Sequence, residues 1–513
     1  MAALTPGPMS PAGAPDDRPF PPGRYPVVVV GSGPGAIQSS YSLGRLGVQH
    51  AVISADDAPG GMFRRFPLFQ RLITWTKPYA PVERGTREYE WYDWNSLLGE
   101  EPEHRAVMPG LMDGASYFPS RPEMEAGQIE FVRRTAVRVR LGCRWERTRH
   151  DEEAGEFVLE TTDGEYRCTV AVFALGMTDP WVAPVPGLDQ VPHYVDTKPS
   201  REYAGKRVFI VGKRNSGFEI ADGLLPWARQ VILGSPRPAR LSILVHSTAA
   251  ARARYLQPYE DHVLGGGTLV LDAAIQNVER QGGGWRVRAS GTTRPGDLVF
   301  DVDEVIAATG FRTPLGDLPD LGVATFFQGG RLPAQTPYWE SASVPGIYFA
   351  GNITQGSIGM KKYGIPSNSA AVHGFRYNAR VLAEHLARTM FGIERDRPVL
   401  RPQEVVPYLL AEATAAPELW NQQSYLTRVL EADPARGITD AGIHPLAHFV
   451  DASGPDAVAI AVETDAEGDR HPAVYVRREG RVEEHLLDGD PLDDFAGPGH
   501  RAQLSVLLGD LVE

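Results

Sequence analysis

The sequence predicts an α/β fold in which one strand–loop–helix unit is inserted into another, followed by a small C-terminal α+β appendage. Two stretches carry this prediction. A run of four valines at 27–30 opens into a glycine-rich turn at 31–36 and then a helix-forming segment. A second apolar run at 207–211 opens into the turn 212–217 and another helix-forming segment. Strand, glycine loop and helix in this order are typical of Rossmann-like dinucleotide-binding domains, in which the helix N-terminus receives a pyrophosphate.

Each small residue of the first turn has an expected task. Gly31 permits the tight turn, and Gly33 lets the backbone approach a pyrophosphate closely. Gly35 and Ala36 are small enough for the helix to pack against the strand. A lone glycine motif is a weak signal, but the strand before it and a second strand at 50–53 support a dinucleotide site.

The end of this second strand departs from the usual pattern. An acidic residue there often binds the adenosine ribose, but Ser54 stands at the expected position and Asp56 follows it. Two readings stay open: the serine hydroxyl replaces the carboxylate, or Asp56 reaches back. The flexible turn with Gly61, Met62 and Phe63 is expected near the same nucleotide.

Bulk composition excludes several classes of protein. The 513 residues leave room for two or three domains, and 51 basic against 64 acidic residues give a net charge of −13, which argues against nucleic-acid binding. No apolar run approaches the roughly 18 residues of a membrane span, and no secretion signal is visible, so a cytoplasmic location without membrane attachment is expected. Cys143 and Cys168 form neither a redox-active pair nor a zinc pattern, and the 13 histidines lack metal-ligand spacing.

Composition and motif order predict the domain boundaries. Residues 1–24 form a proline-rich disordered tail. The first dinucleotide domain comprises 25–198 and 331–398, the second 199–330, and the appendage 399–513, for which the sequence predicts no purpose.

The second glycine loop differs from the first because Arg214 replaces its middle glycine. That change prevents the closest backbone approach, although the arginine side chain could contact a phosphate. Ser235 and Arg237 follow the next strand, where a ribose 2′-phosphate would lie and where no acid favours a free hydroxyl. NADPH is therefore favoured over NADH.

The segment 64–125 is too long for a plain connection, and long insertions are often functional. It carries Thr76 and Lys77, and its aromatic residues Trp91 and Trp94 are expected to fill a core. His373 is expected to be a packed helix residue rather than a base.

Taken together, these motifs resemble those of the two-dinucleotide-binding-domain flavoproteins over residues 25–395. The turn 31–36 resembles the FAD loop, 173–176 the exit from that domain, 212–217 the NAD(P) loop, and 349–352 the closing flavin motif. Within that group, the stretch 303–311 resembles the flavin-containing and N-hydroxylating monooxygenases. The Phe-x-Gly-x-x-x-His signature of one branch is not intact, and Thr76-Lys77 stands where relatives often place an asparagine.

The resemblance implies an enzyme that uses FAD, NADPH and dioxygen, acts through a flavin C4a-(hydro)peroxide, and N-hydroxylates a small amine or amino acid in specialised metabolism. Thr76, Lys77 and Asn352 are the candidate catalytic residues, and Lys77, Lys361 and Lys362 the candidates for binding an anionic substrate group. S-oxygenation, Baeyer–Villiger oxidation, a reductase with an external acceptor and a non-catalytic nucleotide sensor remain alternatives. A homo-oligomer is a possible assembly.

The residues expected to bind the two cofactors are Gly31, Gly33, Pro34, Gly35, Ala36, Ser54, Asp56, Gly61, Met62, Phe63, Trp145, Ala174, Gly176, Gly212, Lys213, Arg214, Asn215, Ser216, Gly217, Ser235, Arg237, Thr309, Gly310, Gly351 and Asn352.

Overall fold

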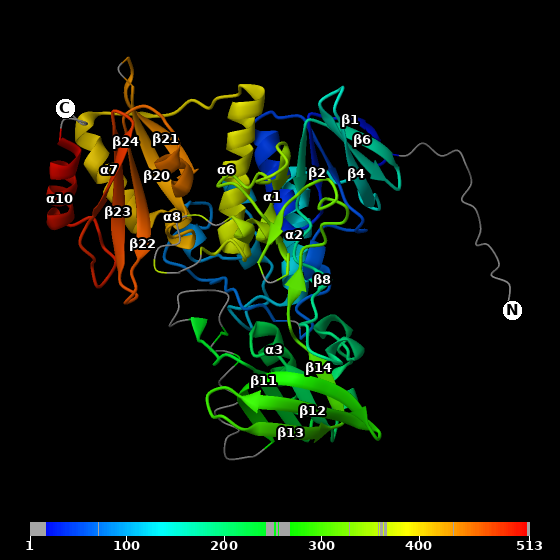
Figure 1. Cartoon of the computed structure of the whole chain (residues 1–513). Helices are drawn as coiled ribbons and strands as arrows, with labels where there is room; N and C mark the ends of the chain where they lie inside the picture. The colour runs from blue at the N-terminus through cyan, green and yellow to red at the C-terminus, as the bar shows by residue number, and fades with distance from the viewer. Residues whose placement is uncertain are drawn as a thin grey trace.

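The computed structural model of the chain has three lobes (Figure 1). It describes residues 17–69, 71–242, 251–252, 255, 267–327, 329–357, 359, 363, 367–433 and 435–509. One lobe carries the first glycine loop, a second lies below it in Figure 1, and the C-terminal lobe lies on the other side of helix α6.

The first lobe is built on a four-stranded parallel sheet in the order β18-β7-β2-β3. Its strands are β2 (Val27–Val30), β3 (His50–Ile53), β7 (Val170–Phe173) and β18 (Ile347–Phe349), and they pack on helices α1 (Pro34–Arg45) and α6 (Val372–Phe391). All four valines of β2 are buried, which is why this strand reads as an uninterrupted apolar run. Helix α6 begins four residues later than the sequence suggests, because Ala371 is extended and caps it.

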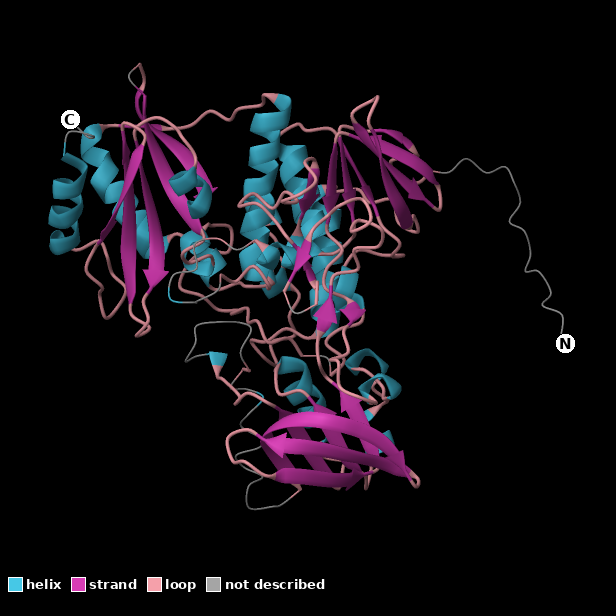
Figure 2. Ribbon diagram, in the orientation of Figure 1, coloured by secondary structure: helices cyan, strands magenta, loops and turns pink. Residues whose placement is uncertain are grey.

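The second lobe comes from the chain between β7 and β18, so the second unit is inserted into the first. Its sheet has the order β13-β12-β11-β10-β9-β14, parallel from β11 to β14 and antiparallel at the other edge. The bounds are β9 (Arg207–Val211), α3 (Asn215–Leu224), β10 (Gln230–Ser235), β11 (Thr268–Gln281), β12 (Gly284–Gly291), β13 (Asp297–Val302) and β14 (Glu304–Ala307). Figure 2 shows the strands of this sheet in magenta in the lower lobe.

A smaller sheet, β1-β6-β5-β4, flanks the first lobe. Its strands are β1 (Gly23–Arg24), β4 (Trp145–Asp151), β5 (Glu156–Thr161) and β6 (Gly164–Cys168). Two short antiparallel pairs lie outside this sheet: β8 (Asp179–Pro180) pairs with β15 (Phe311–Arg312), and β16 (Thr325–Phe326) pairs with β17 (Leu332–Pro333). Strand β4 begins only at Trp145, because the backbone of 140–144 hydrogen-bonds to Val52, Ser54 and Asp56 instead.

The insertion after β3 is mostly loop and short 3₁₀ turns. These are η1 (Gly61–Arg64), η2 (Glu88–Trp91), η3 (Pro102–His104) and η4 (Met108–Gly110), followed by helix α2 (Arg121–Thr135). A capping box between Ser120 and Glu123 starts α2, and left-handed Ala136 ends it before the Val139 expected from sequence. Further 3₁₀ turns are η5 (Leu188–Gln190), η6 (Tyr194–Asp196), η7 (Ser200–Tyr203) and η8 (Gly351–Gly356).

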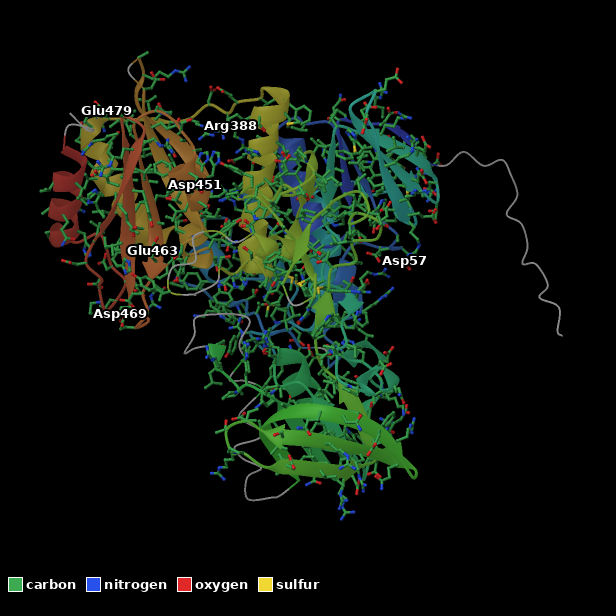
Figure 3. The ribbon with its side chains drawn as sticks, in the orientation of Figure 1. Asp57, Arg388, Asp451, Glu463, Asp469 and Glu479 are labelled. Carbon is green, nitrogen blue, oxygen red and sulfur yellow. The ribbon has the colours of Figure 1, made fainter. Side chains whose placement is uncertain are left out.

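The C-terminal lobe is an α+β unit around a six-stranded antiparallel-paired sheet in the order β19-β21-β20-β22-β23-β24. The bounds are β19 (Val399–Leu400), α7 (Pro402–Ala415), α8 (Pro417–Asn421), β20 (Leu426–Asp433), β21 (Gly437–Pro445), α9 (Leu446–Asp451), β22 (Ala457–Thr464), β23 (Arg470–Arg478), β24 (Arg481–Leu486) and α10 (Pro498–Leu508). Figure 3 places Asp469 and Glu479 at opposite ends of the sheet, as expected for turns at either end of β23.

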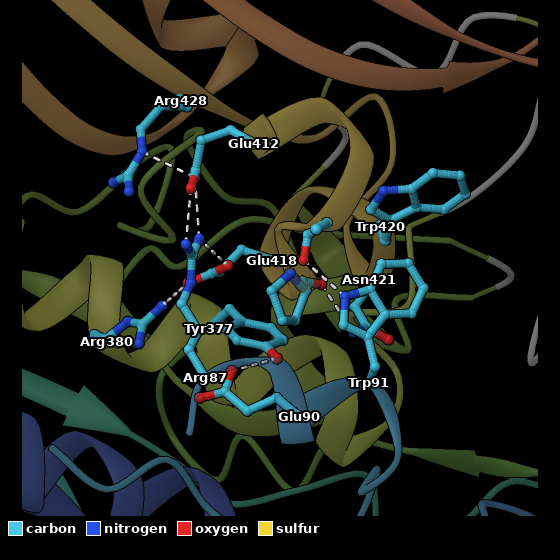
Figure 4. Close-up of polar contacts among 12 residues, drawn as sticks. Arg87, Glu90, Trp91, Tyr377, Arg380, Glu412, Glu418, Trp420, Asn421 and Arg428 are labelled. Carbon is cyan, nitrogen blue, oxygen red and sulfur yellow. Dashed lines mark hydrogen bonds and ion pairs between the residues drawn. The ribbon is translucent and has the colours of Figure 1, made fainter. Parts of the chain in front are cut away.

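Buried ion pairs join this lobe to the insertion (Figure 4). Arg87 donates to Glu412 and Glu418, each at 2.7 Å. Arg428 binds the same Glu412 carboxylate at 3.0 Å, and Arg380 of α6 pairs with Glu418. The glutamate side chains are only 8% and 3% exposed, so loss of one arginine would leave buried negative charge poorly paired.

Candidate functional site

A cavity of about 1840 Å³ lies where the two glycine loops face each other, and residues of both dinucleotide lobes line it. Pockets for a single small molecule usually measure about 300–1,000 Å³, so this space is large enough for more than one ligand. It opens at the carboxyl ends of β2, β7 and β9, the edge at which open α/β sheets bind ligands.

The first loop is held by backbone contacts that only glycine allows. Gly31 has φ +134°, and a Cβ there would lie 2.6 Å from the Ala174 carbonyl oxygen. A Cβ at Gly35 would lie 2.4 Å from the Cα of Gly351. Gly35 therefore lets the helix pack on the closing motif after β18, rather than on β2 as the sequence suggested.

The N-terminus of α1 is open toward the cavity. Its cap is Gly33, which provides no side-chain hydrogen bond, and Pro34 occupies the first turn. A Cβ at Gly33 would meet only the Cα of Gly61, at 3.7 Å, so the space in front of the helix is a cradle that a side chain would fill. Unpaired N–H groups and the helix dipole at such an end suit a pyrophosphate.

The turn after β3 packs against this loop. The Gly60 N–H donates to the Ser32 carbonyl at 2.9 Å, and Gly61, Met62 and Phe63 line the cavity. Ala36 lies just behind the lining, fully buried on α1.

The two readings of the ribose position are distinguished by the side chains. The Ser32 hydroxyl donates to the Asp56 carboxylate at 2.5 Å, while the Ser54 hydroxyl accepts from the Asp56 N–H at 3.2 Å. The carboxylate thus reaches back toward the glycine loop, and Ser54 positions it. Both Ser54 and Asp56 line the cavity.

The flavin half of the cavity is also lined by Trp145, Ala174, Gly176, Gly351 and Asn352. The Asn352 side-chain oxygen is buried and has no hydrogen-bond partner in the described structure. A buried amide oxygen left unpaired is costly, so a ligand hydrogen-bond donor there would satisfy it. The cradle and this oxygen fit a flavin dinucleotide.

The second loop repeats the backbone packing of the first. Gly212 has φ +132°, and a Cβ there would lie 2.3 Å from the Ala308 carbonyl oxygen. A Cβ at Gly217 would lie 2.3 Å from the Gly212 carbonyl oxygen, which keeps Gly217 behind the cavity wall. Arg214 caps α3, so this helix begins at Asn215, three residues before the sequence suggested.

Cationic and polar residues gather on this half of the cavity. The lining includes Lys213, Arg214, Asn215, Ser216, Ser235, Arg237, Arg240, Thr309, Gly310 and Arg331. Burial, with the Arg214 charge nearby, lowers the pKa of the Arg331 guanidinium. Such a cluster suits the phosphates of a second dinucleotide.

Lys213 has a different role from the one expected. Its ammonium forms an ion pair with Asp272, and that carboxylate also accepts from the Thr293 hydroxyl at 2.8 Å. Lys213 touches the cavity, but its charge is already neutralised by a protein carboxylate.

Thr76 and Lys77, expected near the flavin, are not among the cavity-lining residues. The buried Thr76 hydroxyl donates to Asp93 at 2.8 Å. Lys77 is exposed, with its ammonium 5.0 Å from the Trp75 ring centroid and 5.6 Å from that of Tyr92. Leu72, Ile73 and Thr74 of the same segment reach the cavity instead. The other two expected lysines, Lys361 and Lys362, lie outside the described residues.

The insertion aromatics are packing residues, as expected. The Trp91 indole N–H donates to the Ala415 carbonyl at 2.7 Å, and Trp94 stacks on Trp75 and on His373 at centroid distances of 4.4 and 4.3 Å. His373 is completely buried, and burial lowers its pKa well below the usual value, so it is neutral. The described part of the chain contains no group of three side chains suited to a metal ion.

Several lining residues were not predicted from the sequence: Ser32, Arg240, Arg252 and Arg331. The concentration of arginines at 237–252 was the available signal. The sequence does not show which of these side chains face the cavity, because that depends on how the chain folds.

This fold and cavity define a two-dinucleotide-binding-domain flavoprotein. Residues 28–351 match the pyridine nucleotide-disulphide oxidoreductase family, and the chain belongs to it. FAD and NADPH are its cofactors.

The similar proteins carry two kinds of name, FAD-dependent oxidoreductase domain-containing protein and ferredoxin–NADP reductase. The FAD-dependent oxidoreductase domain-containing protein 2 of Danio rerio is 25% identical over 71% of this chain and 59% of its own length. The Mus musculus protein of the same name is matched over 34% of its length, so the chain spans well under two thirds of both. A ferredoxin–NADP reductase of Salinispora tropica is 26% identical over 72% of this chain and 98% of its own length.

Solved structures show the same fold at low identity. The bacillithiol disulfide reductase of Bacillus cereus has a TM-score of 0.52, 21% identity and coverage of 71% of this chain and 99% of its own. The ornithine N-hydroxylase of Kutzneria sp. 744 has a TM-score of 0.52, 15% identity and coverage of 72% and 100%. Among the described helices of the present chain, none combines the length and apolar character needed to cross a bilayer.

Proposed function

We propose that the protein is an NADPH-dependent FAD monooxygenase that transfers one oxygen atom of dioxygen to a small nucleophilic substrate. N-hydroxylation of a small amine or amino acid is the specific reaction proposed. The observation that carries the proposal is the single cavity shared by both glycine loops, whose described walls contain no thiol.

The family's name refers to disulfide chemistry, but the thiols of this chain do not support it. The Cys143 thiol is buried and lies 3.4 Å from the Thr161 hydroxyl, and burial raises its pKa. Burial raises the pKa of Cys168 to about 12. Neither lines the cavity, and neither is a thiolate at neutral pH.

The chain's own residues bind and orient the reactants. The α1 and α3 N-termini would each hold a pyrophosphate, Asp56 the adenosine ribose and Arg237 the 2′-phosphate. Asn352 would accept a hydrogen bond from the flavin or its ribityl chain with the oxygen that has no protein partner. Bound FAD supplies hydride acceptance and oxygen transfer, while the enclosing walls exclude water from the reacting atoms.

The test is whether an oxygen atom from dioxygen appears in the product. FAD-loaded protein is incubated with NADPH, ¹⁸O₂ and a panel of small amines and thioethers, and products are examined by mass spectrometry. We expect substrate-dependent NADPH oxidation and one ¹⁸O atom in the product. Gly33→Val, which fills the pyrophosphate cradle, should be colourless and inactive. NADPH oxidation that yields only hydrogen peroxide with every substrate would reject the proposal.

An NADPH-dependent reductase with an external acceptor is the second candidate. The match to nearly the whole length of the Salinispora tropica reductase favours it. Anaerobic transfer of electrons from NADPH to a ferredoxin, without oxygen incorporation in air, would support the reductase instead.

A further inference from the structure

Arg252 is a cavity-lining cation whose hydrogen-bonding capacity is not used within the described structure. Its Nε and Nη2 atoms are buried and have no hydrogen-bond partner there. Burial lowers the pKa of its guanidinium. A buried guanidinium in this state is costly unless an anion arrives to pair with it.

His373 lies in the same region and is equally unpaired. Both of its ring nitrogens are buried without a partner, and the ring stacks on Trp94 at a centroid distance of 4.3 Å. Of the two nearby guanidiniums, Arg376 is engaged, since it donates to the carbonyls of Asp93 and Ser96 at 2.8 Å each. Arg252 is the other, and two of its guanidinium nitrogens have no partner in the described structure, against one in Arg376.

Arg252 lies beside Asn215, a residue expected to bind the second cofactor, and also reaches toward the flavin lobe. Its backbone N–H donates to the Asn215 side chain at 3.2 Å, at the start of α3. Its guanidinium acts electrostatically on His373, in the first turn of α6. The side chain thus bridges the nicotinamide lobe and the flavin lobe, where Ala371 and Val372 also line the cavity.

We propose that Arg252 binds the carboxylate of the substrate at the junction of the two dinucleotide lobes. The inference deepens the proposed function, on which it rests, by assigning the substrate an anionic group. A guanidinium offers a carboxylate two parallel donors, which orients the ligand as well as attracting it.

The test compares two probes that differ only by a carboxylate, 4-aminobutyrate and n-butylamine, titrated into oxidised FAD-loaded enzyme. Binding is read from the flavin absorbance difference spectrum. We expect saturable binding of 4-aminobutyrate, and tenfold or more weaker binding of n-butylamine. Arg252→Gln should weaken 4-aminobutyrate binding by about ten- to a hundredfold, the size of a lost charge-assisted pair. Arg252→Lys should restore part of it.

Arg294→Gln, at an exposed arginine of the same lobe outside the cavity, should leave both titrations unchanged. Equal binding of the two probes to the wild type, or discrimination that survives Arg252→Gln, would overturn the inference. So would an Arg252→Gln enzyme that binds NADPH tenfold more weakly but keeps its carboxylate preference, since Arg252 would then bind a cofactor phosphate. The titration needs neither NADPH nor dioxygen, so its result is independent of whether oxygen transfer occurs.

Discussion

Replacing Gly35 with alanine should release FAD, although only one methyl group is added. The new Cβ would lie 2.4 Å from the Gly351 Cα and 2.6 Å from the Gly351 nitrogen. Carbon atoms in contact stay about 3.5–4.0 Å apart, so α1 or the closing motif must move by roughly 1 Å. Neither neighbour can rotate away, because both contacted atoms belong to the backbone.

The strain of such overpacking costs about 1–3 kcal/mol. Alanine also favours the helix by up to about 1 kcal/mol, which offsets part of that cost. The displaced elements both line the cavity, so we expect FAD affinity to fall at least tenfold while the rest of the chain stays folded. The measurement is flavin content after purification, followed by reconstitution of the apoprotein with FAD monitored by flavin fluorescence.

Gly44 provides the matched control in the same helix. A Cβ there meets only His50 Cε1 at 3.8 Å, an ordinary contact. Gly44→Ala should therefore retain FAD and unfold at the same or a slightly higher temperature. If Gly35→Ala binds FAD as tightly as Gly44→Ala does, the assignment of the α1–Gly351 contact to cofactor binding is wrong.

Three further predictions concern the coenzyme, the C-terminal lobe and acid stability. Arg237→Ala should reduce the preference for NADPH over NADH about ten- to a hundredfold in kcat/KM, the value of a charge-assisted phosphate contact; an unchanged ratio would contradict this. Arg87→Met should cost about 3 kcal/mol in denaturant unfolding because it strips a partner from two buried carboxylates, whereas Arg286→Met, which removes the partner of the exposed Asp301, should cost far less. Burial lowers the pKa of His385 to about 4, so the unfolded chain, with a pKa of about 6.5, binds a proton that the folded protein does not. The free energy of unfolding should therefore fall by about 1–2 kcal/mol on acidification from pH 7 to pH 5. His385→Phe should lose less stability than the wild type between pH 7 and pH 5, and an equal loss would show that other groups dominate.

Local patterns were enough to predict the two dinucleotide units. Gly31 and Gly212 each take a positive φ, which favours glycine and so marks both turns in the sequence, although the carbonyls beside them belong to the distant residues Ala174 and Ala308. The buried parallel strands read as continuous apolar runs, since both of their faces are covered. Fold class, inserted order and cofactors followed from these features.

The C-terminal lobe was predicted less completely. Strand β22 is buried at every position and stands out as apolar in the sequence. In contrast, β20 carries the ion-paired Arg428, and the edge strand β24 is mostly exposed and polar. Their extended structure depends on pairing with neighbouring strands, which local sequence does not specify.

The direction in which charged side chains point was decided by the tertiary structure alone. Lys77 and Arg252 are equally plausible anion ligands in the sequence, because each is a cation in a long irregular segment. Folding places the Lys77 ammonium over Trp75 at the exposed surface, and it places Arg252 in the cavity wall between two helix N-termini. The sequence determined that phosphate-binding loops exist and where they lie along the chain. Which cations face them depends on packing between segments that are not adjacent in the sequence, such as Arg252 beside Asn215.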